Sequence, residues 1–270
     1  MNVLAIGRKA RAALEASGGV ARPLAAFPDA PYFEAAGEIV WVGSKLPARH
    51  PRAVLTAQPV ARCAEVSFGA LPGKAWSRTM PVRVDPAVVA GACRRLVGAI
   101  DRVGAPRGFG ALLAGVTPSF PLDLAAPRVR ALAAAYRADD AQTVYAASRA
   151  LLGLGTGLTP SGDDLAGTAL FGRMLVDRSD RWRVIGARLA TDACTASHAI
   201  SAALFADHVA GETFESLHAL ADALVVDNGA AALEAARTLV ALGHSSGWDM
   251  LTGFAIGVTS GVTGEVRGEG

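Results

Sequence analysis

Cysteine is scarce in this chain, and its few copies lie far apart. The three cysteines are Cys63, Cys93 and Cys194. Such wide spacing forms neither a disulfide framework nor the ligand pattern of a zinc site. We therefore expect reduced, buried thiols that pack as small apolar side chains, as in a cytosolic protein.

Long apolar runs and a secretory leader are also missing. No run reaches the roughly 18 residues that a membrane helix needs, although 51% of the residues are hydrophobic. The first residues place a short apolar piece before the basic side chains, which is the reverse of a secretory signal. We expect a soluble, cytoplasmic protein with no membrane partner.

An excess of charge of either sign is absent. Lysine and arginine number 26 against 24 aspartates and glutamates, so the formal net charge is only +2. This balance argues against an electrostatic nucleic-acid binder. The length of 270 residues suits one large domain or two closely packed ones.

Several familiar catalytic signatures are missing. No lysine of the Walker type follows the glycine-rich segment described below, and no βαβ unit is predicted around it. There is no G-x-S-x-G elbow, and His244 beside Ser245 and Ser246 is adjacency in sequence, which is not triad geometry. What remains fits a small anionic ligand held by backbone N–H groups and hydroxyls.

What the sequence does contain is a glycine-rich segment, GLGTGLTPSGDD, at residues 153–164. It runs directly into an apolar helical pattern over residues 165–174. Ser161 and Asp164 have the spacing of a capping box, and in an alternative register Thr159 is the cap and Pro160 the first helical residue. In both, the N–H groups of a helix end lie beside a flexible glycine loop, which is typical of anion sites.

The adjacent carboxylates Asp163 and Asp164 are the unusual feature of this segment. Neighbours on a helix do not share a face, so only one of the two suits the positive helix end. The other is free to hold a cation such as Mg²⁺, a substrate amide or a proton. No other cofactor is indicated, and the simpler interpretation is a capped helix after a loop.

A second copy of the frame stands near the C-terminus, in GHSSGWDMLTG at residues 243–253. Ser-Gly-x-Asp-apolar occurs at residues 161–165 and again at residues 246–250. We predict that the two helix ends converge on one small anionic ligand. The candidate catalytic residues are Asp163, Asp164 and Asp249. The candidate substrate-binding residues are Gly155, Gly157, Thr159, Ser161, Gly162, His244, Ser245, Ser246 and Gly247.

Both segments resemble motifs of the AllH-type subunit of oxamate carbamoyltransferase, which read G-x-G-x-G-L-T-P-S-G-D-D and G-H-x-S-G-W-D. The resemblance is best from about residue 140 onward. It implies carbamoyl transfer between oxalurate and phosphate, giving oxamate and carbamoyl phosphate, together with other subunits. It also implies secondary site hydroxyls near Ser197 and Ser201. The alternatives are a non-catalytic subunit, and a related transferase or ligase that acts on another amide or acyl phosphate.

The predicted fold class is α+β. Residues 1–84 are expected to form a small, mostly antiparallel β-rich region, with strands at residues 38–42, 53–56 and 81–84 and a helix at residues 5–16. Residues 85–270 are expected to form a helical domain that carries both motifs. Its helices are predicted at residues 85–103, 122–137, 140–152, 182–209, 212–224, 227–242 and 247–262.

Some individual side chains are assigned from their surroundings. Trp41 and Trp76 are interpreted as packing residues of the β-rich region. His50, His208 and His218 are interpreted as exposed. In the helix predicted at residues 182–209, we expect Thr191 and Thr195 to bond back to carbonyls of the preceding turn.

Overall fold

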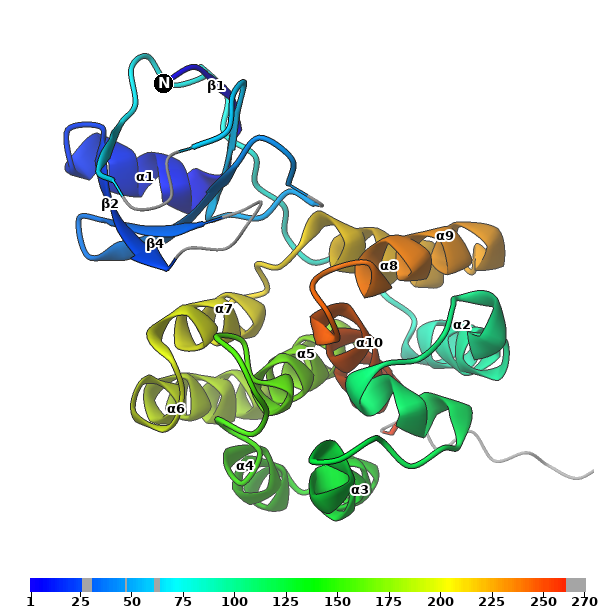
Figure 1. Cartoon of the computed structure of the whole chain (residues 1–270). Coiled ribbons are helices and arrows are strands. Elements are labelled where there is room, and N and C mark those ends of the chain that lie inside the picture. Colours follow the sequence, from blue (N-terminus) through cyan, green and yellow to red (C-terminus); the bar gives the residue numbers. More distant parts are fainter. Residues whose placement is uncertain (26–30, 47, 61–63, 261–270) are drawn as a thin grey trace, which may run out of the picture. The chain divides into compact units, whose positions relative to one another are not determined.

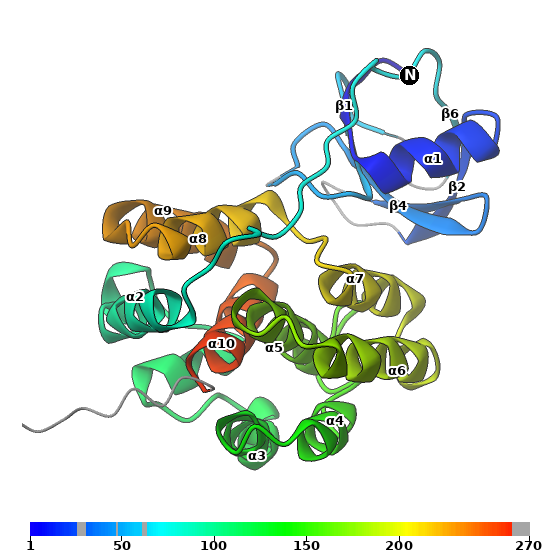
Figure 2. The same cartoon turned by 180° about the vertical axis from the view of Figure 1, so that it is seen from behind.

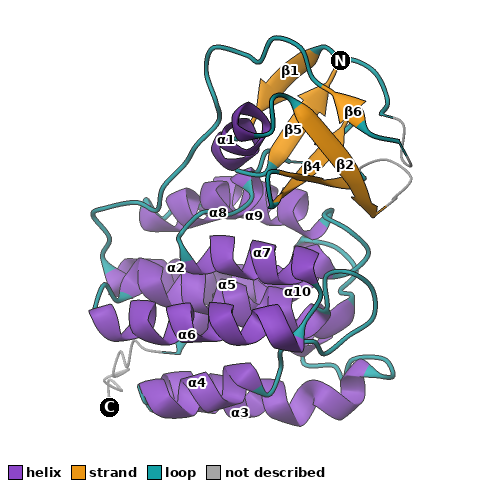
Figure 3. Cartoon of the chain, turned by 90° about the vertical axis from the view of Figure 1, so that its left-hand side faces the viewer, coloured by secondary structure: helices purple, strands orange, loops and turns teal. Residues whose placement is uncertain are grey.

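The computed structural model describes residues 1–25, 31–46, 48–60 and 64–260. The chain divides into two compact units, which we describe separately. The first unit comprises Met1–Thr79 together with Glu212–Glu215, and the second comprises Met80–Gly211 and Ser216–Gly270. Figure 1 follows the chain through both units, and Figure 3 distinguishes their strands and helices by colour.

The first unit is built on a six-stranded sheet with the strand order β1-β5-β4-β3-β2-β6. Its strands are β1 (Val3–Ile6), β2 (Val20–Ala25), β3 (Tyr32–Ala35), β4 (Glu38–Gly43), β5 (Ala53–Thr56) and β6 (Val66–Ser67). All neighbouring pairs are antiparallel except β4 and β5, which run parallel with Val42 opposite Val54. The prediction of a mostly antiparallel sheet is confirmed.

Helix α1 (Arg8–Ala16) packs against β3 and β4. Its buried residues Ala10 and Leu14 join Phe33, Val40 and Val54 in the core of this unit. The segment 212–215, which comes much later in the chain, adds Phe214 to the same unit. No sequence signal indicated this return of the chain.

The second unit is helical. Its α-helices are α2 (Pro86–Gly98), α3 (Ala126–Arg137), α4 (Ala141–Arg149), α5 (Ser161–Val176), α6 (Asp180–Ala196), α7 (Ala199–Val209), α8 (Glu215–Val225), α9 (Gly229–Val240) and α10 (Ser246–Thr259). Short 3-10 helices lie between α2 and α3, at η1 (Ile100–Arg102), η2 (Gly108–Ala114) and η3 (Leu122–Ala125). The predicted α+β class is therefore confirmed, with the strands in the first unit.

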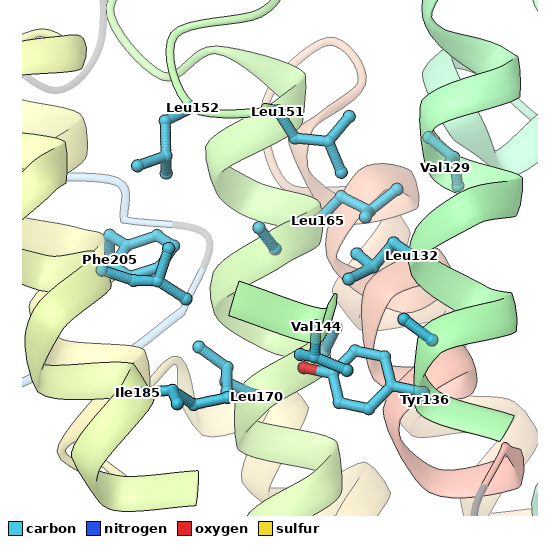
Figure 4. Packing of buried hydrophobic residues seen from close by; sticks show 14 of the residues in the cluster. Val129, Leu132, Tyr136, Val144, Leu151, Leu152, Leu165, Leu170, Ile185 and Phe205 are labelled. Carbon is cyan, nitrogen blue, oxygen red and sulfur yellow. The ribbon is translucent and has the colours of Figure 1, made fainter. Parts of the chain in front are cut away.

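Helix α5 is the centre of the second unit. Every residue from Ser161 to Leu175 is buried, and Figures 1 and 2 show α5 between α7 and α10. The apolar cluster around it joins Leu165 and Leu170 to Leu132 of α3 and Phe205 of α7 (Figure 4). Burial of these side chains contributes about 25 cal/mol per Å² of apolar surface to stability. The glycine loop therefore ends at a helix that is held in place by its packing.

Helices α5 and α10 run parallel in direct backbone contact. A Cβ atom built on Gly253 would lie 2.0 Å from the carbonyl oxygen of Leu165, and one built on Gly257 would lie 2.0 Å from that of Ala169. Both numbers increase together along the two helices, so the N-termini of α5 and α10 are at the same end of the pair. Only glycine permits this approach.

Several predicted elements need correction. Residues 81–84 form no strand, and the 3-10 helix η2 (Gly108–Ala114) lies in a segment where no helix was predicted. The helix predicted at residues 182–209 is two helices, α6 and α7, which break at Ser197 and His198 because the His198 side chain accepts the N–H of Ile200 and begins a new helix. The division of the chain into separate domains at residue 84 stays a prediction.

The histidine and cysteine assignments were also partly wrong. His50, His208 and His218 are all buried. His208 packs beside Gly167 of α5, and burial lowers its pKa to about 4. Cys93 is buried as predicted, Cys194 is exposed, and Cys63 lies outside the described residues. No helix within the described ranges combines the length and apolar character of a membrane span.

Candidate functional site

The first motif does not form the predicted cap. Pro160 is the N-cap of α5, and no side chain bonds to that end, so both the Ser161–Asp164 capping box and the Thr159 cap were wrong. The backbone satisfies the first turn instead. Gly162 N–H donates to Leu154 O at 2.8 Å, and Asp163 N–H donates to Pro160 O at 3.0 Å. The side chains of the motif are therefore free for other contacts.

The second motif repeats this arrangement at α10. Ser245 is the N-cap without a side-chain bond, and Gly247 N–H donates to Leu242 O at 3.0 Å. The motif glycines Gly162 and Gly247 are packing positions, since a Cβ at either would lie 2.0 Å from a carbonyl oxygen, of Leu151 and Leu239 respectively. The shared sequence frame thus encodes the same local packing twice.

The two motifs meet directly. The hydroxyls of Thr159 and Ser246 are 3.2 Å apart and share a hydrogen bond. Asp164 and Asp249 lie in the first turns of α5 and α10. The two helices pack side by side at Leu165 and Gly253, and the charge of Asp249 raises the pKa of Asp164. The prediction that both motifs meet is confirmed, while the ligand that they share stays a prediction.

The comparison with known families bears on this pair of motifs. Residues 151–258 match the family of the oxamate carbamoyltransferase subunit AllH. We call residues 151–258 the AllH-type segment after this similarity, and the resemblance seen in its motifs is confirmed. The matched range contains both motifs and the helices α5 to α10 almost completely. No curated protein and no solved structure matches the chain.

Within the AllH-type segment, Asp163 is held by three donors. Its Oδ1 accepts the N–H of Gly153 at 2.8 Å, and its Oδ2 accepts the hydroxyl of Ser201 at 2.7 Å and that of Ser197. Asp163 is 1% exposed. The carboxylate thus fixes the start of the glycine loop to the break between α6 and α7, which explains why Ser197 and Ser201 matter to the motif.

Asp249 has a partner outside the AllH-type segment. Its Oδ1 accepts the N–H of Phe109 at 2.6 Å, while its Oδ2 is buried and has no hydrogen-bond partner among the described residues. Gly108 and Gly110 flank Phe109, and a Cβ on Gly108 would lie 2.3 Å from Asp249 Oδ1. Burial raises the pKa of Asp249 to about 6, and the Phe109 N–H and nearby serine hydroxyls oppose that rise. Sequence reasoning missed Phe109, although its flanking glycines mark a close approach.

Asp164 differs from both other aspartates. It is 4% exposed, and in the described part of the chain its Oδ2 has no hydrogen-bond partner. Burial first, and then the charges of Asp249 and Asp163, raise the pKa of Asp164 well above its ordinary value, and the Ser246 hydroxyl opposes this. A carboxyl group in this setting favours the protonated form.

The glycine loop is exposed at its centre. Thr156 and Gly157 are exposed, and a Cβ on Gly157 would meet nothing within 4 Å. Within the described residues, the N–H groups of residues 155–159 have no hydrogen-bond partner in the chain. Gly153, Gly155 and Gly157 all have positive φ, at 73°, 125° and 90°. Consecutive amides in such a turn can surround an anion.

The remaining candidates lie at the same end of the helix pair. His244 is exposed, and its carbonyl accepts a bond from Arg107 at 3.4 Å. Ser245 and Ser246 are half-buried. In the described ranges no group of three or more His, Cys, Asp or Glu side chains is placed to hold a metal ion. The Mg²⁺ role of Asp163 and Asp164 stays a prediction, and the three donors on Asp163 favour a structural role for it.

Thr191 and Thr195 confirm the structural interpretation made for them. Their hydroxyls donate to Ala187 O at 3.1 Å and Asp192 O at 3.0 Å. Ser197 and Ser201 were expected as secondary site hydroxyls on one continuous helix, residues 182–209. They lie instead on either side of the break between α6 and α7, and both reach Asp163.

Proposed function

We propose that this chain is a subunit of an oxamate carbamoyltransferase-like enzyme and that its paired motifs bind a small anionic substrate. The observation that carries the proposal is the hydrogen bond between Thr159 and Ser246, which joins two motifs inside one AllH-type segment. The family description names a subunit, so other chains are expected in the enzyme. We expect it to act in the cytoplasm.

The reaction that we propose moves a carbamoyl group between oxalurate and phosphate. The bond between the carbamoyl carbon and the oxamate nitrogen breaks, and a phosphate oxygen bonds to that carbon. The proton lost by phosphate ends on the oxamate nitrogen, so the products are oxamate and carbamoyl phosphate. No step needs a protein nucleophile, because positioning and charge stabilisation lower the barrier.

The anion is expected at the loop and not at the first turn of α5. Gly162, Asp163 and Asp164 already donate their N–H groups to backbone carbonyls, so they cannot also donate to a ligand. The amides of residues 155–159 and the hydroxyls of Thr159 and Ser246 supply the donors instead. This shifts the predicted anion site by a few residues from the helix end toward the glycine loop.

The test removes the Thr159 hydroxyl, which joins the two motifs. Thr159→Val keeps the shape of the side chain and removes its hydroxyl, and Thr191→Val makes the same change on α6. We expect the first variant to lower kcat/KM for carbamoyl phosphate formation from oxalurate by about tenfold or more in the purified complex. The control variant should retain full activity.

A non-catalytic role is the second candidate, because the first-turn amides of α5 are satisfied internally. It makes a different prediction. The isolated chain would then show no thermal shift with oxamate, carbamoyl phosphate or phosphate, and Thr159→Val would leave the activity of the complex unchanged. Those two results together would replace the first proposal with this one.

A further inference from the structure

The three aspartates of the paired motifs differ in how well their carboxyl oxygens are hydrogen-bonded. Asp163 accepts three hydrogen bonds, so both of its carboxylate oxygens have partners. Asp164 and Asp249 each keep a buried Oδ2 atom without a partner among the described residues. Buried carboxyl oxygens that lack partners are costly, so their retention points to a group that is absent from the chain itself.

Asp164 and Asp249 differ in the backbone donors that their carboxyl groups receive. Asp249 Oδ1 accepts the backbone N–H of Phe109 at 2.6 Å, and such a donor stabilises the ionised form. No backbone N–H donates to the Asp164 side chain in the described ranges. Two neighbouring buried carboxyls disfavour double ionisation, so the proton belongs on Asp164, which has no backbone N–H donor.

A pair with one proton offers both a donor and an acceptor. The protonated carboxyl donates its O–H, and the ionised one accepts. A primary amide, H2N–C=O, such as that of oxamate, has the complementary set, since its carbonyl oxygen accepts and its NH2 donates. A carboxylate ligand has acceptors only and would place a second negative charge beside Asp249.

We propose that Asp164 and Asp249 recognise the primary amide of oxamate, with the Asp164 O–H donating to its carbonyl oxygen and Asp249 Oδ2 accepting from its NH2. This inference rests on the proposed function and assigns an orientation to the ligand. The anionic end lies toward the amides of residues 155–159. Raised pKa values of both carboxyls agree with one proton held between them near neutral pH.

The experiment compares two nearly isosteric ligands, oxamate and oxalate, which differ by an amide in place of a carboxylate. Binding is measured by titration calorimetry at pH 7 on the full-length chain, alone and in the purified complex. We expect the wild type to prefer oxamate by at least about tenfold. Inorganic phosphate, which has no amide, reports on the anion end alone.

The variants separate the two carboxyl roles. Asp249→Asn removes the negative acceptor and should abolish the preference for oxamate. Asp164→Asn keeps a neutral group with a donor and should retain most of it, whereas Asp164→Leu should abolish it. Asp180→Asn is the matched control, because Asp180 also lies in the first turn of a helix and its side chain is 88% exposed.

The outcomes distinguish failure of this inference from failure of the proposed function on which it rests. Equal binding of oxamate and oxalate by the wild type would overturn the inference alone, provided that either ligand binds. Loss of preference in Asp164→Asn and Asp249→Asn to the same degree would overturn the placement of the proton. Absence of binding by oxamate, oxalate and phosphate, in the chain and in the complex, would overturn both proposals.

Discussion

At the scale of single residues, the two neighbouring aspartates of the first motif have opposite environments. Asp163 accepts three hydrogen bonds, whereas the pKa of Asp164 is raised by burial and by the charges of Asp249 and Asp163. Their adjacency predicts that they face different ways. It does not predict which one is satisfied, because the donors on Ser197 and Ser201 lie 34 and 38 residues further along the chain.

Asp163→Asn is expected to destabilise the protein by about 3 kcal/mol. One side-chain oxygen becomes an NH2 group that faces donors, so at least one buried hydrogen bond is lost and a repulsive contact replaces it. The measurement is the free energy of unfolding from urea titration at pH 7. Asp180→Asn, on an exposed side chain, should change that free energy by less than about 0.5 kcal/mol.

Ser201→Ala provides a graded comparison for the same cluster. It removes one of the donors to Asp163 but leaves the charge in place, so a smaller loss of about 1–2 kcal/mol is expected. If Asp163→Asn cost no more than the Asp180 control, the assignment of a structural role to Asp163 would be wrong.

At the scale of elements, the sequence predicted most helices and the repeated frame, because caps, prolines and apolar periodicity are local signals. It did not predict the break between α6 and α7. No glycine or proline marks that point, and the new helix begins with His198, which accepts the N–H of Ile200 at 3.2 Å. A histidine cap is too uncommon a signal to override a continuous helical pattern.

Gly253→Ala is expected to separate α5 from α10 and to cost about 2–3 kcal/mol. The added Cβ would lie 2.0 Å from Leu165 O and 2.5 Å from Thr168 Oγ1, and the backbone carbonyl cannot move aside alone. The change in the free energy of unfolding measures this cost. Because the displaced helices carry Asp164 and Asp249, oxamate binding should weaken as well.

Gly229→Ala is the matched control for that substitution. Gly229 is the first residue of α9, and a Cβ there would meet nothing within 4 Å. Alanine has the higher helix propensity, so this variant should be neutral or more stable by up to about 1 kcal/mol. Equal effects of the two substitutions would contradict the close approach of α5 and α10.

At the scale of the whole molecule, the chain leaves the first unit after Thr79 and returns to it for residues 212–215. Phe214 is 7% exposed, with its ring centroid 5.9 Å from that of Trp41 and 4.5 Å from that of His50. Sequence reasoning placed the boundary near residue 84 from composition. It could not detect four residues that return from a distant, helix-rich context.

Phe214→Ala should therefore destabilise the first unit more than the second. Loss of a buried phenylalanine costs about 3–4 kcal/mol. Hydrogen exchange resolved by position should show faster exchange in β4 and β5, with little change in α5. Phe120→Ala is the control, because Phe120 is 78% exposed. Equal acceleration in β4 and α5 would contradict the assignment of residues 212–215 to the first unit.

The pH dependence of overall stability reports on the buried carboxyl pair. The pKa of Asp249 in the folded protein is raised from its ordinary value of 3.8 to about 6, chiefly by burial. A raised folded-state pKa contributes stability that is fully present below pH 3.8 and is lost as pH rises through about 6. Asp249 should therefore lower the free energy of unfolding by about 3 kcal/mol across that window. Asp164 is the titratable group on α5 that is coupled to Asp249, and the charge of Asp249 raises its pKa.

Other carboxylates act in the opposite direction, so the comparison needs a variant. The pKa of Asp177 is lowered, after an opposing effect of burial, by hydrogen bonds from Arg181 and Trp182, and its stabilisation is lost below about pH 4. Asp249→Asn leaves that effect unchanged and removes the cost of ionising Asp249. The stability of Asp249→Asn relative to wild type should then rise from pH 4 to pH 7 in parallel urea titrations. A difference that stays constant over this range would mean that Asp249 ionises at its ordinary pKa, and the single shared proton would have no physical basis.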